Sequence, residues 1–409
     1  MTDTHSPATE ISTDIVIFGG GIAGLWILNQ LHSQGYSVLL LEAESLGNGQ
    51  SIASQGIIHG GLKYALDGSL SGAATAIAGM PARWRRCLAG NDPVNLSGCR
   101  VLSDRYYMWS EGSFRSRLKA FLGSRTLRGK VDVVDEADFP IPLREAKGQG
   151  SLYELPDFVI DTFSLLDTLA SHHRQCIYRY TPTRLEIQPA GADGYRHLRI
   201  GSVNGSLVAK TQRIILAAGE GNAALLKQVE LAGPQMQTRP LNMVMLRKPN
   251  LPKLFLHCIG DSFSLTPRLT LTSHPCRNGD VAWYLGGELA EIGTGRNDSE
   301  QIASARQLLQ ELFPWVDLDG ASWACLRINR AEGREPGRHR PDSVFLKASG
   351  DFLIAWPTKF TLSPALADGI LAELTKQGIL PALQFDPAVA AAVLNSATVA
   401  SPPWETSFA

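Results

Sequence analysis

The sequence predicts an α/β protein of two domains, one built on a parallel sheet and the other on a mainly antiparallel sheet. Three observations predict it. A short apolar strand, Asp14 to Phe18, leads into glycines and an apolar helix, and a second apolar run, Ser37 to Leu41, follows. From Gln235 to Glu288 the pattern changes to β-rich stretches punctuated by Pro and Gly. The chain has 409 residues, more than one hydrophobic core usually serves.

The turn after the first strand has the pattern of a Rossmann-like dinucleotide-binding unit. Gly19, Gly21 and Gly24 have the spacing G-x-G-x-x-G, with Ile22 and Ala23 between them. Gly19 permits a tight turn, Gly21 lets backbone approach a pyrophosphate, and Gly24 lets the helix pack on the strand. The free N–H groups and the dipole at the start of this helix favour an anion.

An acid ends the second strand. Glu42, followed by Ala43, comes about 20 residues after the glycines, where a carboxylate accepts ribose hydroxyls. Strand, glycines, helix, strand and acid in this order predict a bound dinucleotide. They do not separate FAD from NAD, because both present adenosine diphosphate to this unit.

The next segment, Ser51 to Tyr64 (SIASQGIIHGGLKY), is rich in Ser and Gly. It resembles the D-amino-acid oxidase family of FAD-dependent oxidoreductases, particularly the glycerol-3-phosphate dehydrogenase-like and 2-hydroxyglutarate oxidase-like branches. The resemblance suggests that the chain is a bacterial member of this family. The alternative is a Gly-rich surface loop. Such loops seldom place two large apolar residues, here Ile57 and Ile58, between glycines so close to a nucleotide-binding unit. In the family this segment passes beside the flavin. The resemblance therefore implies FAD as the cofactor and, as its contacts here, Ser54, Gln55, Gly56, Ile58 and His59.

The resemblance also implies the domain organisation. An FAD-binding domain of the glutathione-reductase type would be discontinuous, and a substrate domain would be inserted in it. We expect the FAD-binding domain at 1–85, 151–230 and 326–409, and the substrate domain at 86–150 and 231–325.

Composition excludes several classes of protein. Hydrophobic residues at 44% and charged residues at 19% are ordinary for a globular chain, and a net charge of −1 argues against nucleic acid as a partner. The six cysteines include no C-x-x-C pair, so neither a disulfide framework nor a metal site is expected. Met1 to Thr13 lacks the basic start of a signal peptide, and Ile15 to Leu28 is too short to span a bilayer. We expect a cytoplasmic protein.

One segment departs from this neutral balance. Residues 113–130 carry six basic residues and no acid between them, and their apolar residues follow helical spacing. A basic amphipathic helix can lie on a membrane surface or dock on a partner. A solvated helix that covers its own domain is the commoner case, and we favour it.

The middle of the chain predicts a return to the parallel sheet. Asp161 to His173 is a helix with Asp161 at its N-cap, and Ile177 to Gln188 pairs with Tyr195 to Leu207 as a hairpin. In the family one such strand lends backbone to the adenine, which makes Arg184 and Leu185 candidates.

Thr211 to Gly219 (TQRIILAAG) is another buried-strand run that ends in small residues. Such an end permits close approach to a ligand at the carboxyl edge of a sheet. It matches the family's second dinucleotide motif, so that Ala218, Gly219 and Gly221 become cofactor candidates. A core strand with a tight turn is the alternative.

The later part of the chain adds two helices, a loop and a strand. Ser299 to Phe313 is a helix stopped by Pro314, and Cys325 to Asp342 is interpreted as a basic loop. A strand ends at Trp356, and a helix starts near Ser363. In the family this helix start points at the pyrimidine edge of the flavin, so we expect cofactor contacts from Lys359, Phe360, Thr361 and Leu362.

Three residues are candidates for catalysis: His59, Lys359 and Lys63. His59 could orient substrate, act as a base or tune the flavin, and the alternative is a histidine that only bonds to backbone. Lys359 could stabilise negative charge on the reduced flavin. Lys63 stands where the glycerol-3-phosphate dehydrogenases carry Arg, and the change removes a bidentate contact to phosphate. The candidates for substrate binding are Lys63, Tyr64, Arg268, Arg327 and Arg330.

These features predict an FAD-dependent oxidase or dehydrogenase. It would take hydride from a C–H bond next to an amine or hydroxyl of a small, anionic substrate and pass electrons to oxygen or a quinone. Two alternatives stay open. One is a flavoprotein that binds FAD as a sensor or scaffold without turnover, and the other is an oxidase of RNA-borne amines, which the neutral charge disfavours.

Overall fold

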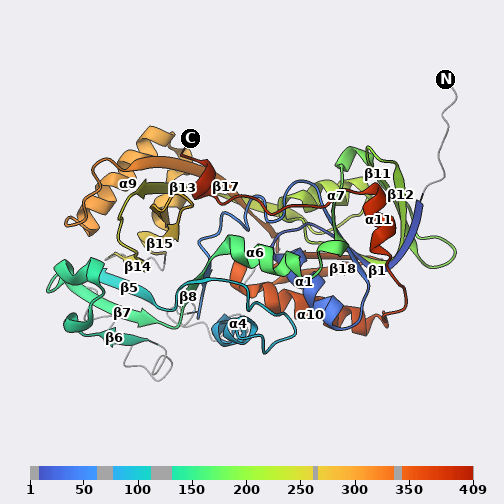
Figure 1. Ribbon diagram of the computed structural model, residues 1–409, viewed down its shortest axis with the longest axis horizontal. Helices are drawn as coiled ribbons and strands as arrows, with labels where there is room; N and C mark the ends of the chain where they lie inside the picture. Colours follow the sequence, from blue (N-terminus) through green and yellow to red (C-terminus); the bar gives the residue numbers. More distant parts are fainter. Residues whose placement is uncertain (1–8, 62–76, 112–130, 261–265, 336–342, 409) are drawn as a thin grey trace.

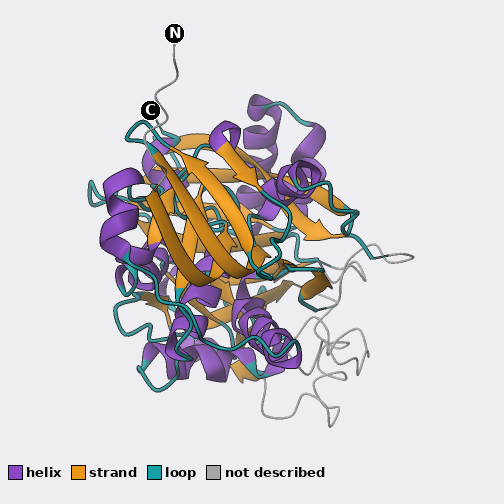
Figure 2. Ribbon diagram, turned by 90° about the vertical axis from the view of Figure 1, so that its right-hand side faces the viewer, coloured by secondary structure: helices purple, strands orange, loops and turns teal. Residues whose placement is uncertain are grey.

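The structure is a computed structural model, and it describes residues 9–61, 77–111, 131–260, 266–335 and 343–408 (Figure 1). Two eight-stranded sheets and one three-stranded sheet organise these residues. The large sheets occupy the two ends of the long axis, and Figure 2 shows the strands in the middle with helices around them. Lys63, Tyr64 and the basic segment 113–130 lie outside the described residues.

The first large sheet contains the expected nucleotide-binding unit. Its strand order is β10-β11-β12-β1-β2-β9, with β19 paired to β12 and β18 to β19. β1 lies between β12 and β2 and is parallel to both. The strands are β1 (Thr9–Phe18), β2 (Val38–Glu42), β9 (Ile177–Arg179), β10 (Leu185–Ile187), β11 (Arg196–Gly201), β12 (Ser206–Leu216), β18 (Phe345–Ser349) and β19 (Phe352–Trp356).

Both faces of this sheet are covered. Ile15 and Ile17 of β1 join a core cluster with the helices on one face, whereas Val16 and Phe18 join the cluster on the other. The sheet strands are therefore apolar at successive positions, as expected for a parallel sheet. The first face carries α1 (Ile22–Ser33), α4 (Met80–Leu88), α6 (Thr162–Ser171) and α10 (Ser363–Lys376), and the second carries α7 (Asn222–Gln228) and α11 (Pro387–Val393).

The second large sheet has the order β17-β13-β16-β15-β14-β5-β7-β6. Its neighbouring strands are antiparallel except β14 and β5, which are parallel, so the prediction of a mainly antiparallel sheet is confirmed. The strands are β5 (Tyr106–Glu111), β6 (Asp132–Val134), β7 (Gly150–Leu155), β13 (Met236–Lys248), β14 (Leu256–Ile259), β15 (Leu269–Pro275), β16 (Val281–Gly286) and β17 (Ser322–Gly333).

Helices cover one face of the second sheet, and the chain's last turn covers part of the other. Leu309 of α9 packs with Val244 and Leu246 of β13. Trp404, close to the C-terminus, packs with Met243 and Tyr284 on the opposite face. The helices concerned are α8 (Glu288–Ile292), α9 (Asp298–Leu312) and α12 (Pro403–Thr406).

A small sheet connects the two halves. It has the order β3-β8-β4, formed by β3 (Ile57–Ile58), β8 (Phe158–Ile160) and β4 (Val101–Ser103). Ile57 pairs with Val159, so the residues just beyond each strand come close together. The remaining regular elements are short 3₁₀ helices: η1 (Glu136–Asp138), η2 (Ile141–Ala146), η3 (Arg174–Cys176), η4 (Pro182–Arg184), η5 (Gly219–Gly221), η6 (Gly293–Gly295) and η7 (Phe360–Leu362).

The interpretation of Cys325 to Asp342 as a basic loop is wrong for its first part. Residues up to Gly333 belong to β17, which pairs with β13 along its whole length. Leu326 and Ile328 pack against the Trp404 cluster while Arg327 between them pairs with Asp298, so alternation, not charge, was the relevant signal. The expected domain boundary at 325/326 falls inside this strand, and the one at 150/151 falls inside β7.

The expected hairpin at Ile177 to Gln188 is only partly correct. β9 is parallel to β2 and forms an edge of the sheet, whereas β10 alone pairs antiparallel with β11. Two further predictions concern cysteines and membrane spans. In the described residues, none of the six cysteines forms a disulfide. Within the described ranges, no helix has both the length and the apolar character that crossing a bilayer requires.

Candidate active site

The glycines after β1 form a corner in which backbone replaces side chains. Gly19 has φ +105°, and a Cβ on it would lie 2.6 Å from the Ala217 carbonyl oxygen. A Cβ on Gly24 would lie 1.9 Å from the Gly19 carbonyl oxygen, so any side chain there would push α1 away from the turn. The two positions require glycine for the reasons that the spacing predicted.

Glu42 turns back onto this corner. Its Oε2 accepts a hydrogen bond from the Gly20 amide at 2.5 Å, and its Oε1 accepts one from the Glu44 amide at 2.9 Å. Burial raises the pKa of Glu42, and the backbone hydrogen bonds oppose that rise. Ala43 packs at the edge of the adjoining core cluster. The acid is therefore held at the tip of β2 beside the start of α1, as the sequence predicts.

Ser51 is a residue of the corner that sequence reasoning missed. Its Oγ accepts a hydrogen bond from the Ile22 amide at 3.0 Å and lies 3.0 Å from a Cβ built on Gly21. The hydroxyl thus lies at the N-terminus of α1, where a phosphate would be bound. The available signal was a Ser at the start of the Ser-Ile-Ala-Ser segment, within reach of a helix start that lacks a capping side chain of its own.

The second glycine-containing loop meets the same corner. Ala217, just after β12, is the residue against which Gly19 packs. Asn222 holds the loop, because its Oδ1 accepts from the Ala218 amide at 2.8 Å and its Nδ2 donates to the Leu216 carbonyl at 3.1 Å. Gly219 has φ +58°, and its carbonyl accepts from the Trp356 ring N–H at 2.9 Å. The three predicted residues here, Ala218, Gly219 and Gly221, lie together beside β1.

The Ser-Gly segment before His59 bridges the two large sheets. Gln55 donates from Nε2 to the Tyr284 carbonyl at 2.9 Å and to the Thr270 carbonyl at 3.2 Å, both in the second sheet. Gly56 has φ +72°, and its Cβ would lie 2.1 Å from the Ile160 carbonyl oxygen. Ser54 accepts from the Gly56 amide at 3.2 Å. Ile58 is fully buried in the core of the first sheet.

His59 lies where this segment meets the loop before α10. Its amide donates to Thr361 Oγ1 at 3.1 Å, and the Thr361 carbonyl accepts from the Trp84 ring N–H at 3.0 Å. Phe360 stacks on Trp84 with ring centroids 5.9 Å apart. Lys359 precedes this turn and is half-buried, and Leu362 is fully buried. Segments 302 positions apart in the chain are therefore joined. That they form the two sides of a flavin site stays a prediction.

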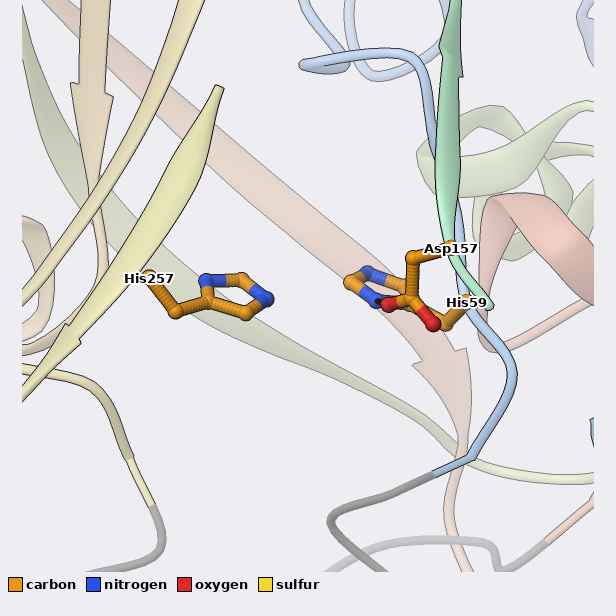
Figure 3. A group of neighbouring side chains, drawn as sticks. All are labelled: His59, Asp157 and His257. Atoms are coloured by element: carbon orange, nitrogen blue, oxygen red, sulfur yellow. Dashed lines mark hydrogen bonds and ion pairs between the residues drawn. The ribbon is translucent and has the colours of Figure 1, made fainter. Parts of the chain in front are cut away.

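A third side chain and a fourth segment complete the cluster around His59 (Figure 3). Asp157, directly before β8, accepts from His59 Nδ1 at 3.1 Å and from the Gly60 amide at 2.7 Å. His257 of β14 points at His59 from the opposite side, with ring centroids 5.9 Å apart and planes inclined by 9°. Neither Asp157 nor His257 was predicted, since nothing near either residue in the sequence points to this meeting.

Comparison with known proteins bears on this geometry. The sequence profile of the family described as FAD dependent oxidoreductase (DAO) matches residues 14–374, which span both large sheets. The chain belongs to this family.

One relative matches this chain over nearly its whole length. It is 43% identical to the protein named "Probable FAD-dependent oxidoreductase PA4991" of Pseudomonas aeruginosa, over 98% of this chain and 99% of that one. The crystal structure of that protein superposes with a TM-score of 0.82 at 39% identity, covering 98% of this chain and 99% of that chain.

More distant solved structures share the fold. L-alpha-glycerophosphate oxidase of Mycoplasma pneumoniae, solved with FAD bound, has a TM-score of 0.63 at 14% identity, covering 92% of this chain and 97% of that one. Glycine oxidase of Geobacillus kaustophilus has a TM-score of 0.60 at 17% identity, over 92% and 97% of the two chains.

The corner described above fits the family's cofactor, FAD. Glycine is required at Gly19 and Gly24, an acid lies at the strand tip, and the N-terminus of α1 presents backbone donors beside Ser51. FAD is the cofactor of this DAO member, as of its relatives.

The arginines predicted for substrate do not gather at His59. Arg268 pairs with Glu311 at 3.0 Å, Arg327 with Asp298 at 3.4 Å, and Arg330 with Glu291 at 3.1 Å, all acids of α8 and α9. These pairs lie toward the helices of the second sheet. The adenine candidates lie beside β11 and α7: Arg184 lies against Gly201, and the Leu185 carbonyl accepts from Gln228.

Proposed function

We propose that this DAO-family member is an oxidase or dehydrogenase that removes hydride from a C–H bond next to an amine or hydroxyl of a small, anionic molecule. One observation carries the proposal: the hydrogen bond between the His59 amide and Thr361 Oγ1. It joins the Gly-rich segment to the turn that starts α10, and so brings a titratable imidazole to a helix N-terminus. Proton transfer and stabilisation of negative charge can then occur at one place.

The chain's residues divide into those that hold the cofactor and those that act beside it. We assign the pyrophosphate and ribose to the glycine corner with Glu42, and the flavin ring to the segments around Gln55 and Thr361. Bound FAD supplies a two-electron acceptor that takes hydride at N5. Thr361 and Leu362 lie at the turn that would face the pyrimidine edge, and Lys359 adds positive charge there.

His59 is the proposed base, and Lys63 with Tyr64 the proposed anchor for the substrate's anionic group. The arginine candidates contribute less, because Arg268, Arg327 and Arg330 already pair with acids. The electron acceptor is oxygen or a quinone. The names of the distant relatives, an oxidase of L-alpha-glycerophosphate and one of glycine, support a small anionic substrate.

Anaerobic reduction tests the proposal. The yellow holoenzyme is mixed with single amino acids and hydroxy acids, and the flavin absorbance band is followed. Loss of the flavin absorbance with one of these compounds, at a rate fast enough for catalysis, supports an oxidoreductase that uses that compound as its substrate. Retention of full absorbance with every member, although dithionite bleaches the protein, favours the sensor or scaffold instead.

Two simple observations test the partners. Purified protein that carries no nucleic acid supports a small-molecule substrate, whereas co-purifying RNA favours oxidation of RNA-borne amines. Flotation with anionic liposomes at low salt tests residues 113–130. We expect no binding, in keeping with a cytoplasmic enzyme.

A further inference from the structure

Residues 394–408 form a segment that crosses from the first large sheet to the second, the crossing segment. The DAO profile matches residues 14–374, so the crossing segment lies beyond it. It follows α11, runs in an irregular conformation to residue 402, and continues into α12. Figure 1 shows it in dark red between the two ends of the molecule. Three sets of its contacts bear on the cofactor site.

The first contact is with the edge of the first sheet. The Arg179 amide of β9 donates to the Asn395 carbonyl at 2.7 Å, and a β-bridge joins Ser396 to Tyr178. Arg179 lies opposite Glu42, the acid at the tip of β2. The crossing segment therefore starts one strand away from the carboxylate assigned to the ribose.

The second contact is with the loop that closes over the glycine corner. The Leu46 amide donates to the Thr398 carbonyl at 2.8 Å, and the Ala400 amide donates to the Leu46 carbonyl at 3.0 Å. Leu46 is 1% exposed, and a Cβ on Gly20 would collide with its Cδ2. The neighbouring Gly47 amide donates to the Gly20 carbonyl at 2.8 Å. Two hydrogen bonds of the crossing segment thus hold the residue that packs against the corner.

The third contact is a buried tryptophan on the second sheet. Trp404 in α12 is 2% exposed and stacks on His274 of β15, with ring centroids 3.8 Å apart and planes inclined by 20°. Glu405 adds a polar contact, because its Oε1 accepts from the Arg277 amide at 2.8 Å. A helix as short as α12, with four residues, is not stable by itself in water. The packing of Trp404 therefore holds α12 in place.

Tyr284 links this tryptophan to the segment before His59. The ring centroids of Tyr284 and Trp404 lie 6.0 Å apart. The Tyr284 hydroxyl donates to the Ala53 carbonyl at 3.0 Å, and its own carbonyl accepts from Gln55 Nε2 at 2.9 Å. Tyr284 is fully buried, so these hydrogen bonds are shielded from water. Trp404 thus packs against the residue that positions the segment assigned to the flavin ring.

We propose that the crossing segment is a strap that retains FAD, fastened to the second sheet by Trp404. At one end it holds Leu46 against the glycine corner, and at the other it packs on the residue that positions Gln55. One stretch of chain then ties together both proposed ends of the cofactor site. FAD enters and leaves when Trp404 detaches and the strap opens. The inference rests on the assignment of FAD to the glycine corner in the proposed function.

The strap can open without unfolding either sheet. Between its two ends it is held by backbone hydrogen bonds, and Asn395, Ser396, Thr398 and Ser401 are exposed. Segments with few buried contacts open at a lower free energy than the core of a protein. Trp404 has the largest side chain of the strap and is buried, so its contacts limit the opening.

A purely structural cover is the competing explanation, since Trp404 also shields apolar residues of the second sheet such as Met243. The two explanations predict different rate constants for FAD. Opening a strap gives access to the site, so a weaker strap should raise both the association and the dissociation rate constant. Loss of a cover damages the sheet and the site, which speeds dissociation without speeding association.

The test measures both rate constants for FAD in variants of the full chain. Binding to the apoprotein is followed by the change in flavin fluorescence. Release from the holoenzyme is followed by capture of FAD with an excess of a second FAD-binding apoprotein. Trp404→Ala should raise both rate constants by at least about 10-fold, because the contact area of a large aromatic ring is lost. Trp404→Phe, which keeps an aromatic ring, should lie near the wild type.

Trp315→Ala is the matched control. Trp315 packs on the helix-covered face of the same sheet and donates from its ring N–H to the Pro142 carbonyl at 2.8 Å. Its loss should destabilise the second sheet but leave both FAD rate constants unchanged. The strap is overturned if Trp404→Ala raises only the dissociation rate constant or changes neither. It is also overturned if Trp315→Ala raises both to the same extent.

A second variant weakens the other end of the strap and decides the matter if Trp404→Ala does not fold. Ala400→Pro removes the amide that donates to the Leu46 carbonyl, and it should raise both rate constants by a smaller factor. Hydrogen exchange of the holoenzyme tests the connection between the ends. In Trp404→Ala the Leu46 and Ala400 amides should lose protection, while the Val16 amide of β1 keeps it. Unchanged protection at both amides, or unchanged rate constants in Ala400→Pro, contradicts the strap.

The strap and the proposed function fail in different experiments. The rate constants for FAD need no substrate, so they judge the strap even if no compound bleaches the flavin and the proposed substrate class is abandoned. Bleaching by a hydroxy acid or an amino acid supports the proposed function whatever these rate constants are. The strap alone fails if Trp404→Ala binds and releases FAD as the wild type does.

Discussion

The glycine corner and the cluster of His59, Asp157 and His257 are built in opposite ways. In the corner, Gly19, Gly24 and Glu42 belong to one β-α-β unit and act through backbone contacts and a strand-tip carboxylate. In the cluster, the three residues come from separate segments and meet through their side chains. A corner made of backbone tolerates little change of residue. A cluster made of side chains can change its chemistry with one substitution while the fold stays the same.

The largest effect should come from breaking the corner. In Gly24→Val, the new side chain cannot avoid the Gly19 carbonyl oxygen, which lies 1.9 Å from the Cβ position. We expect a loss of FAD binding of at least about 100-fold, since misplacing the helix start removes several hydrogen bonds of about 1 kcal/mol each. Titration with FAD, followed by flavin fluorescence, measures it. Gly295→Ala is the control, because nothing lies within 4 Å of its Cβ, and wild-type affinity in Gly24→Val would contradict the assignment of the corner.

Acid should weaken the half of the molecule that carries His257. His274 in the neighbouring strand β15 is fully buried and stacks on Trp404 at 3.8 Å, and burial lowers its pKa from 6.5 to about 3. Between these values the unfolded chain binds a proton that the folded chain does not. Stability therefore falls as the pH drops below 6.5, by about 1.4 kcal/mol per pH unit from this group alone.

Urea unfolding at pH 7 and pH 5 measures this linkage. His274→Gln cannot titrate, so its loss of stability between the two pH values should be smaller than that of the wild type by about 2 kcal/mol. His172→Gln, an exposed position, should behave as the wild type. An equal pH dependence in all three proteins would show that His274 does not control it.

A milder change in the corner should weaken FAD binding without affecting the cluster around His59. Glu42→Gln keeps an acceptor for the Gly20 amide but removes the charge that strengthens hydrogen bonds from ribose hydroxyls. We expect FAD to bind about 10-fold more weakly, in line with about 1.5 kcal/mol for a charge-assisted bond. At saturating FAD, the rate of flavin reduction by substrate should not change. Glu44→Gln, at an exposed neighbour, is the control, and a changed rate in Glu42→Gln would show that the two regions are coupled.

The smallest effect concerns the loop between the two regions. Lys359→Met removes a positive charge near the proposed pyrimidine edge, so the reduced, anionic flavin should be less stable. The reduction potential should fall by about 30 mV, the equivalent of about 1.4 kcal/mol for two electrons. Dye-coupled reduction measures it, with Lys347→Met on exposed β18 as the control. An unchanged potential would remove Lys359 from the flavin's surroundings.

Much of the first sheet could be predicted from local pattern. Residues Ile15 to Phe18 are apolar at every position because both faces of β1 are covered, and the helix that follows requires glycine where it touches the turn. Both are properties of neighbours in the chain, so spacing reveals them. The wrong prediction concerned Cys325 to Gly333. The basic residues of this strand suggested a loop, although the apolar residues that alternate with them pack into a core.

The candidate site also has parts that the sequence predicted and parts that it did not. The Gly-rich segment and the turn at Thr361 were each predicted, and their hydrogen bond links the two predictions. Ser51 was missed although it is local, since its role depends on a helix start that lies 29 positions earlier. The roles assigned to Lys63 and Tyr64 remain predictions, as those residues lie outside the described ranges.

By itself the sequence determined that this protein binds a dinucleotide and how it does so, because a strand, three glycines and an acid are read along one short stretch of chain. Only the tertiary structure decided which side chains face the reacting end. Asp157 reaches His59 through the pairing of β3 with β8, and His257 does so through the packing of the second sheet across Gln55. The physical reason is that backbone geometry depends on adjacent residues, whereas a side-chain cluster depends on long-range pairing that no local pattern records.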